Sequence, residues 1–378
     1  MFRILLLSGI IIGAFLFLVL LRKPNKTAAD YLLMIWFWAS GHMTFSYYLV
    51  ETSLYLQYPS LTVTGLCLPL LAGPVMYLYI KYQTQPLLFR KLDLLHSAPF
   101  LFCFILFASF YFEPFEKRIE ILNGNIQAYD LFNQIKVISI YLSGIIYIFL
   151  SFKTLMAFRA ELKHAFSNIE KINFNWLLTQ ITGLSIVWIL VLFVRSDNFI
   201  FGAVAVLIIW IGYFGITQVN VFSSSQILFS SALENKDIKI SNSSAEAGNI
   251  KNVDDSNQAL IPVYEQAFAL LKNERLYLNP DLKLLDLAIR LDIHPNLLSK
   301  ALNEVSGKSF YDLVNEQRVQ AFIRKLERKE NNRFTLIALA YDCGFNSKAS
   351  FNRNFKQITG MTPSDYLEVE KGEGRREE

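Results

Sequence analysis

The sequence predicts an all-α protein, in which a polytopic helical membrane bundle is followed by a soluble helical domain with two helix-turn-helix units. Hydrophobic residues make up 53% of the 378 residues and the mean hydropathy is +0.32, which is too apolar for an ordinary globular chain. The apolar excess is confined to residues 1–222, whereas apolar positions after Pro262 follow the period of amphipathic helices. We therefore divide the chain into a membrane domain (1–222), a flexible cytoplasmic linker rich in Asn, Ser, Lys and Asp (223–258) and a soluble domain (259–370).

The membrane domain contains apolar segments that are long enough to cross about 30 Å of hydrocarbon at roughly 1.5 Å per residue. We predict seven spans, at residues 4–21, 31–50, 61–80, 94–112, 137–157, 177–194 and 199–219. The first is expected to be a retained span, because it lacks a small-residue cleavage site and cations follow it directly. In the third span, two prolines accompanied by glycines predict a kinked helix. These are Gly65, Pro69, Gly73 and Pro74.

The cations between the spans predict the orientation in the membrane. Ten Lys and Arg residues follow the first, third and fifth spans, and five lie on the opposite side. Because positively charged loops stay in the cytoplasm, the N-terminus is predicted outside and everything after Val219 inside. The expected location is the inner (cytoplasmic) membrane, with the soluble domain in the cytoplasm.

Candidate sites in the membrane domain are few, since ionisable residues inside the spans are scarce. His42 is the main exception and is a candidate ligand-sensing or pH-sensing group; the alternative is a structural histidine bonded to a carbonyl or hydroxyl. Cys67, Cys103 and Cys343 lack metal-ligand spacing and are predicted to be buried thiols. No metal, cofactor or enzymatic activity is expected, because no nucleophile with its base and no phosphate loop occurs.

The first helix pair of the soluble domain is predicted around a turn at 292–294. Apolar residues from Leu284 to Leu291 mark one helix, and Pro295 begins the next. Buried positions on this second helix are predicted at Leu297, Leu298, Ala301, Leu302 and Val305. The opposite face presents groups suited to base edges and phosphates in a major groove. These are Asn296, Ser299, Lys300 and Asn303.

The second helix pair follows a long helix predicted at 309–329. A short helix over 335–343 is followed by landmarks expected to make a tight turn, fill the core and begin the last helix. In order, they are Gly344, Phe345, Phe351, Phe355, Thr362 and Pro363. The predicted DNA contacts of this pair are Ser347, which also caps the helix, with Lys348, Ser350, Arg353 and Lys356.

The order of these landmarks resembles the DNA-binding domain of the AraC/XylS family of transcription regulators. The resemblance covers about residues 262–367 and is strongest in the continuous segment 340–356. It implies that two recognition helices, joined by the long helix, enter successive major grooves. Two features depart from the family pattern, since Asp292 replaces a glycine and His294 replaces a hydroxyl cap. The domain is also nearly neutral, with 18 Lys and Arg against 17 Asp and Glu in residues 259–378, so a modest salt dependence is expected.

Together these features predict a bacterial one-component transcription regulator in which a signal at the membrane domain changes promoter binding. The expected partners are double-stranded DNA, the lipid bilayer and an unidentified small-molecule, peptide or protein signal, with a homodimer as an open option. Two alternatives remain open. One is a transporter or channel with a regulatory soluble tail, and the other is an anchored regulator released by proteolysis of the linker.

Overall fold

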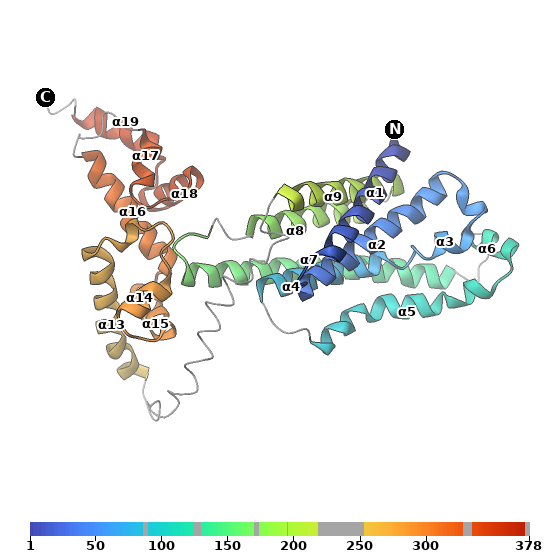
Figure 1. Cartoon of the computed structure of the whole chain (residues 1–378), viewed down its shortest axis with the longest axis horizontal. Helices are drawn as coiled ribbons and strands as arrows, with labels where there is room; N and C mark the ends of the chain where they lie inside the picture. Colours follow the sequence, from blue (N-terminus) through green and yellow to red (C-terminus); the bar gives the residue numbers. More distant parts are fainter. Residues whose placement is uncertain are drawn as a thin grey trace. The chain divides into compact units, whose positions relative to one another are not determined.

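A computed structural model of the chain describes residues 1–85, 90–123, 130–169, 174–194, 196–217, 253–327 and 335–374. The chain forms two compact units, and each is described by itself. The first consists of Met1–Ala157 with Asn173–Ser231, and the second of Phe158–Ile172 with Ala232–Glu378. No β-strand occurs among the described residues, so the predicted all-α fold is confirmed (Figure 1).

The first unit is built from helices α1 to α9, except that α7 from Phe158 onward belongs to the second unit. Their bounds are α1 Phe2–Arg22, α2 Ala28–Glu51, α3 Pro59–Val63, α4 Pro69–Thr84, α5 Ala98–Leu106, α6 Phe115–Leu122, α7 Asp130–Ala165, α8 Phe174–Ile189 and α9 Asp197–Thr217. A capping box begins α2, since Thr27 Oγ1 accepts from the Asp30 amide (3.3 Å) and Asp30 Oδ2 accepts from the Thr27 amide (2.8 Å). Helices α1 and α9 approach closely at Gly9, where an added Cβ atom would lie 2.8 Å from the Cβ of Ala205.

Five helical segments of the described residues are long and apolar enough to cross a membrane. They are Phe2–Arg22, Lys91–Phe110, Asp130–Ala165, Trp176–Val194 and Asp197–Phe214. The predicted spans at 31–50 and 61–80 are not among them, so the number seven stays a prediction. The span predicted at 31–50 corresponds to the continuous helix α2.

The expectation of one kinked helix over 61–80 is wrong. The helix stops at the end of α3 (Val63), and α4 begins at Pro69. Proline lacks an amide hydrogen and restricts the residue before it, so it fits the first turn of a new helix better than the middle of an old one. Pro74 lies inside α4 without ending it. The fourth predicted span is also irregular, since 3-10 turns flank α5.

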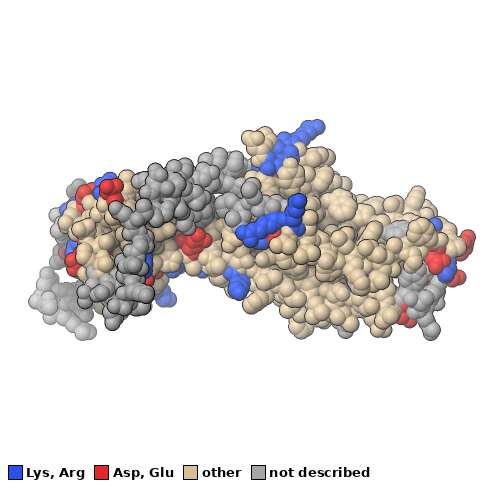
Figure 2. All heavy atoms as spheres, turned by 90° about the horizontal axis from the view of Figure 1, so that it is seen from below, with Lys and Arg blue, Asp and Glu red and all other residues tan. Residues whose placement is uncertain are grey.

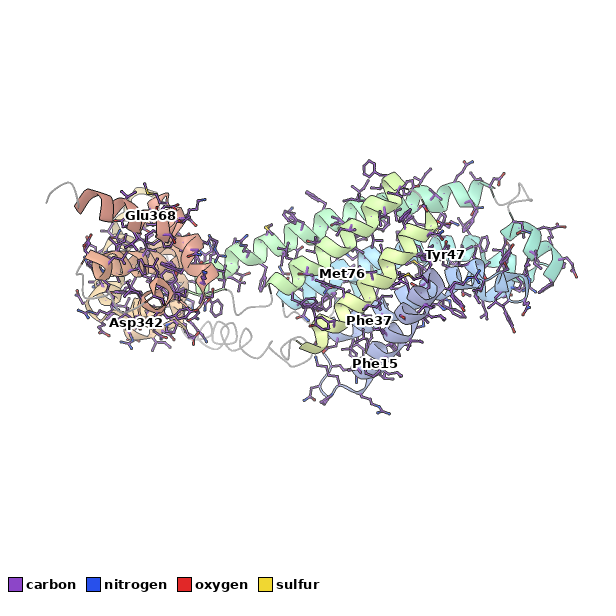
Figure 3. All side chains as sticks on the ribbon, turned by 90° about the horizontal axis from the view of Figure 1, so that it is seen from above. Phe15, Phe37, Tyr47, Met76, Asp342 and Glu368 are labelled. Atoms are coloured by element: carbon purple, nitrogen blue, oxygen red, sulfur yellow. The ribbon has the colours of Figure 1, made fainter. Side chains whose placement is uncertain are left out.

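The surface of the first unit carries many exposed apolar side chains. Ile105 on α5 and Phe149 on α7 are 69% and 66% exposed. Phe15 on α1 is also exposed, whereas Phe37 and Met76 are buried among the helices; all three are labelled in Figure 3. On the face drawn in Figure 2, charged side chains are sparse over most of this unit. Such a surface is typical of helices that face lipid.

His42 lies half-buried on α2 beside Thr64. Its Nε2 atom is 2.6 Å from Thr64 Oγ1, and its ring stacks on Trp38 with ring centroids 5.8 Å apart. This is the hydroxyl-bonded arrangement of the structural alternative, and a sensing role stays a prediction. The thiols of Cys67, Cys103 and Cys343 are buried, as predicted.

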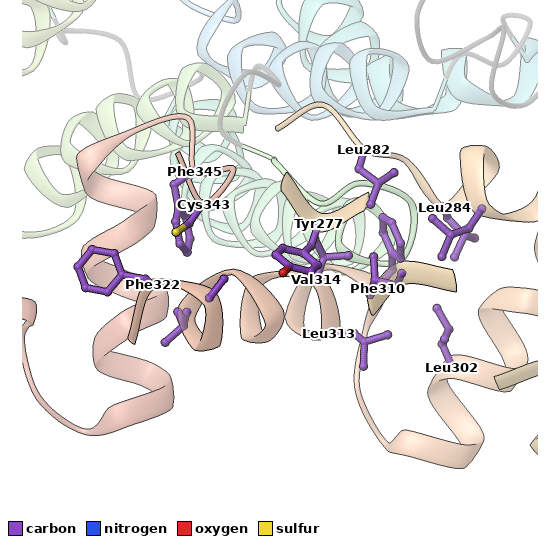
Figure 4. Packing of buried hydrophobic residues seen from close by; sticks show 14 of the residues in the cluster. Tyr277, Leu282, Leu284, Leu302, Phe310, Leu313, Val314, Phe322, Cys343 and Phe345 are labelled. Carbon is purple, nitrogen blue, oxygen red and sulfur yellow. The ribbon is translucent and has the colours of Figure 1, made fainter. Parts of the chain in front are cut away.

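The second unit contains the soluble helices. Their bounds are α13 Val253–Asn273, α14 Leu284–Arg290, α15 Pro295–Ser306, α16 Phe310–Glu327, α17 Leu336–Tyr341, α18 Lys348–Thr359 and α19 Pro363–Gly374, with a 3-10 turn η6 at Leu276–Leu278. One apolar core runs along α16, from Leu284 and Leu302 to Phe322 and Phe345 (Figure 4). Helix α13 begins inside the range predicted as linker, and residues 223–252 of that linker lie outside the described residues.

Candidate nucleic-acid interface

The first helix pair accommodates both departures from the AraC/XylS pattern. Asp292, in place of glycine, adopts a left-handed conformation (φ 52°), which short polar side chains tolerate better than most. His294 caps α15, because its Nδ1 atom accepts from the Asn296 amide (3.2 Å), and Pro295 occupies the first helical position. The turn between α14 and α15 is therefore formed without a glycine or a hydroxyl cap.

Helix α15 has a buried apolar stripe on one side and a polar face on the other. Leu298, Ala301 and Leu302 are fully buried. Leu297 is 40% exposed, so its predicted burial is wrong. At about 100° per residue it lies roughly 90° around the helix from the centre of the buried stripe. Of the predicted DNA contacts, Asn296 and Lys300 are exposed, and Ser299 and Asn303 are partly exposed.

Gly344 makes the turn of the second helix pair. Its φ is +92°, and an added Cβ atom would lie 2.5 Å from the Tyr277 carbonyl oxygen and 3.0 Å from Arg318 Nε. Phe345 fills the core next to it, 3% exposed, with its ring centroid 5.3 Å from that of Phe351. The predicted roles of this glycine and phenylalanine are confirmed.

Helix α18 begins with the predicted cap, because Ser347 Oγ accepts from the Ser350 amide (3.0 Å). Phe351 and Phe355 are buried as predicted. Likewise, α19 begins at Pro363, and Thr362 Oγ1 accepts from the Asp365 amide (3.3 Å). The landmarks of the second helix pair thus occupy the positions expected for them.

The predicted exposure of Ser350 is wrong. The residue is 5% exposed, and its carbonyl oxygen and hydroxyl lie 2.9 and 3.4 Å from Asn354 Nδ2. That amide also donates to the Tyr311 hydroxyl of α16 (2.8 Å), so both residues lie where α18 packs on α16. Sequence analysis missed Asn354 and Tyr311. The one available signal was that Asn354 precedes the buried Phe355 and lies one turn after Ser350.

Three of the predicted contacts on α18 are exposed cations, namely Lys348, Arg353 and Lys356. The helix carries no acidic residue. In contrast, α15 has one lysine and one glutamate, and these form a pair with Lys300 Nζ 3.9 Å from Glu304 Oε1. The positive charge available for phosphates is therefore concentrated on the second helix pair, although the whole domain is nearly neutral.

Arg318 of the long helix α16 binds the turn η6, which precedes the first helix pair. Its Nε donates to the Tyr277 carbonyl (2.8 Å) and its Nη2 to the Asn279 carbonyl (2.8 Å), which ties η6 to α16. The guanidinium is almost wholly buried, and burial lowers its pKa to about 10. A buried charge of this kind keeps its position only while its hydrogen bonds are made.

Comparison with known proteins identifies one domain. Residues 287–368 match a family described as a helix-turn-helix domain, and this range runs from α14 into α19. It therefore includes both helix pairs and the long helix between them, but not α13 or η6. No curated protein matches the chain, and no solved structure does.

Proposed function

We propose that the protein is a membrane-embedded, sequence-specific DNA-binding transcription regulator that passes a signal from its membrane domain to promoter binding. The observation that carries the DNA-binding part is the second helix pair. Its recognition helix α18 has an N-terminus capped by Ser347 and three exposed cations, and it lies inside the range that matches a helix-turn-helix domain. On this helix, Arg353 and Lys348 are the proposed contacts with bases and phosphates. On α15, the proposed contact is Asn296.

The membrane part of the proposal includes seven spans, with α2 and the α3–α4 segment in addition to the five apolar segments. Helix α2 has 24 residues, which is sufficient to cross a bilayer. An odd number of spans agrees with the excess of cations in the loops after the first, third and fifth. It also supports a cytoplasmic location for the second unit, where DNA is available.

Genome-wide occupancy of wild type and a Lys348→Ala, Arg353→Ala double variant tests the DNA-binding assignment, followed by titration of full-length protein on the enriched sites. We expect a loss of about 1 to 3 kcal/mol for a base contact and smaller, sequence-independent losses for phosphate contacts. The matched control is Lys272→Ala, Arg324→Ala, which removes two exposed cations of the same unit from α13 and α16. Equal occupancy by the first double variant and wild type would show that α18 is not the recognition helix.

Reporter fusions test the orientation. Green fluorescent protein fused after residue 222 should fluoresce, and alkaline phosphatase inserted into the loop at 113–136 should be active. The reverse pattern would place the second unit outside the cytoplasm and exclude the regulator.

A further inference from the structure

Residues 158–169 form a segment that we call the α7 strap. They follow the fifth predicted span in sequence, yet they belong to the second compact unit. The strap comprises the last two turns of α7, which is one helix from Asp130 to Ala165, and the four residues after it. Leu162 and Ser167 are 0% and 1% exposed, so the strap is part of the core of this unit.

The strap is anchored at Ser167. Its amide donates to the Leu282 carbonyl (3.2 Å), and its hydroxyl donates to the same oxygen (2.7 Å). Next to it, Phe166 and Lys283 form an isolated antiparallel β-bridge, with Lys283 Nζ 6.0 Å from the Phe166 ring centroid. The strap thus binds the residues immediately before α14.

Two buried side chains of α16 complete this anchor. Arg318 donates to the Ser167 carbonyl (Nη1, 3.1 Å) and lies 3.1 Å from its hydroxyl (Nη2), and Asn315 Nδ2 donates to the same carbonyl (3.2 Å). Arg318 and Asn315 are both 1% exposed. Since a buried donor without a partner is costly, these bonds favour the docked strap.

The strap also reaches a residue predicted to contact DNA. His164 Nδ1 lies 3.2 Å from Asn303 Nδ2, and Asn303 belongs to the polar face of α15. The same amide lies 3.5 Å from Ser299 Oγ, another predicted contact. DNA that approaches Asn303 must therefore displace His164 or take its place as the hydrogen-bond partner.

A second contact extends toward α18. Lys163 Nζ is 3.5 Å from Asp312 Oδ1 and 5.3 Å from the centroid of the Tyr311 ring. The Tyr311 hydroxyl in turn accepts from Arg353 Nη2 (3.0 Å). The strap thus contacts Asn303 directly. It also contacts Tyr311, whose hydroxyl accepts a hydrogen bond from Arg353.

We propose that the α7 strap is an intramolecular inhibitor of DNA binding, which contacts Asn303 at the end of the polar face of α15 when docked and releases it when α7 moves. This proposal rests on the proposed function. The two states differ in the His164–Asn303 and Lys163–Asp312 contacts, and a signal acts by favouring one state over the other. Because α7 continues without a break into the fifth predicted span, a displacement of that helix changes the position of the strap directly.

Removing the strap contacts tests the proposal. In full-length protein in lipid nanodiscs, Lys163→Ala, His164→Ala should bind an enriched DNA site about three- to tenfold more tightly, as expected for the loss of one hydrogen bond and one partly exposed ion pair. Lys153→Ala is the matched control, because it removes one lysine from an exposed position of the same helix. Unchanged or weaker binding by the double variant would overturn the inhibitory role.

A reversible lock tests the docked state itself. Residues opposite each other in an antiparallel bridge have Cα atoms about 4.5 to 5.5 Å apart, which suits a disulfide. We expect Phe166→Cys, Lys283→Cys to form one under mild oxidation, with weaker DNA binding when oxidised and recovery on reduction. The native thiols can be kept, since all three are buried. Equal binding by the oxidised and reduced forms would contradict the proposal.

The two proposals fail in different ways. If the disulfide forms readily but wild type binds no DNA in either redox state, the DNA-binding function is wrong and the regulatory role with it. If wild type binds DNA and the disulfide does not form, the strap is not docked as described, and only the inhibitory contact is refuted.

Discussion

The substitution Gly344→Ala should destabilise the second unit far more than alanine at other left-handed glycines. An alanine with φ +92° costs roughly 1 to 2 kcal/mol in backbone conformation alone. Its Cβ atom would also lie 2.5 Å from the Tyr277 carbonyl oxygen, which accepts from Arg318 Nε at 2.8 Å. Displacing that carbonyl weakens a hydrogen bond to a buried charge, which contributes about 1.5 to 3 kcal/mol. The expected loss in free energy of unfolding is therefore about 2.5 to 5 kcal/mol.

The matched control is Gly307→Ala. Gly307 also has a left-handed conformation (φ +67°), but no atom lies within 4 Å of an added Cβ, so only the backbone cost of roughly 1 to 2 kcal/mol applies. Hydrogen exchange at the core amides of α16, measured in full-length protein, reports both values on one scale. Equal destabilisation by the two substitutions would refute the argument that the Tyr277–Arg318 contact requires a glycine.

Three further predictions concern α18 and the turn that precedes it. Ser347→Ala removes the cap of α18 and should lower the free energy of unfolding by about 1 kcal/mol, with faster hydrogen exchange at the Ser350 amide; unchanged exchange would contradict the cap. Lys356→Ala should weaken binding to specific and random DNA by similar factors and reduce the salt slope by about 1, as measured by titration at several salt concentrations. Burial raises the pKa of the Cys343 thiol to about 11 from an ordinary 9.0, so the folded state binds more protons in this window and stability should fall as the pH rises from 9 to 11. Denaturation of Cys343→Ala should lack that part of the pH dependence.

Local sequence rules predicted the second helix pair well, because its determinants are close together in the chain. The turn requires a glycine at Gly344, the core position an apolar residue at Phe345, and the helix cap a hydroxyl at Ser347. The same rules were wrong for Leu297 and Ser350, which lie near the edges of their buried stripes. At such positions burial depends on how the neighbouring helix packs, and the periodicity of one helix contains no information about its neighbour.

The docking of the α7 strap could not be predicted from the sequence, for a different reason. Its anchor joins Ser167 to Arg318, two residues that are 151 positions apart. Neither residue type indicates the other, and hydropathy assigns the strap to a loop between two spans. The break before Pro69 was similarly hidden, because hydropathy measures the length of an apolar segment and says little about whether its helix is continuous.

The two recognition helices differ in how their predicted contacts are held, and this difference bears on what the strap would control. Helix α18 carries three exposed cations and no acidic residue, so we expect it to supply most of the charge-dependent affinity for DNA of any sequence. Helix α15 has no net charge, and its polar face ends at Asn303, where the strap binds. Hydrogen bonds from the uncharged members of this face, Asn296, Ser299 and Asn303, are expected to discriminate between bases and to release few counterions. Undocking the strap should therefore add sequence discrimination to a complex whose salt dependence is already set by α18, so that the signal changes which sites are occupied more than how strongly DNA is bound in general.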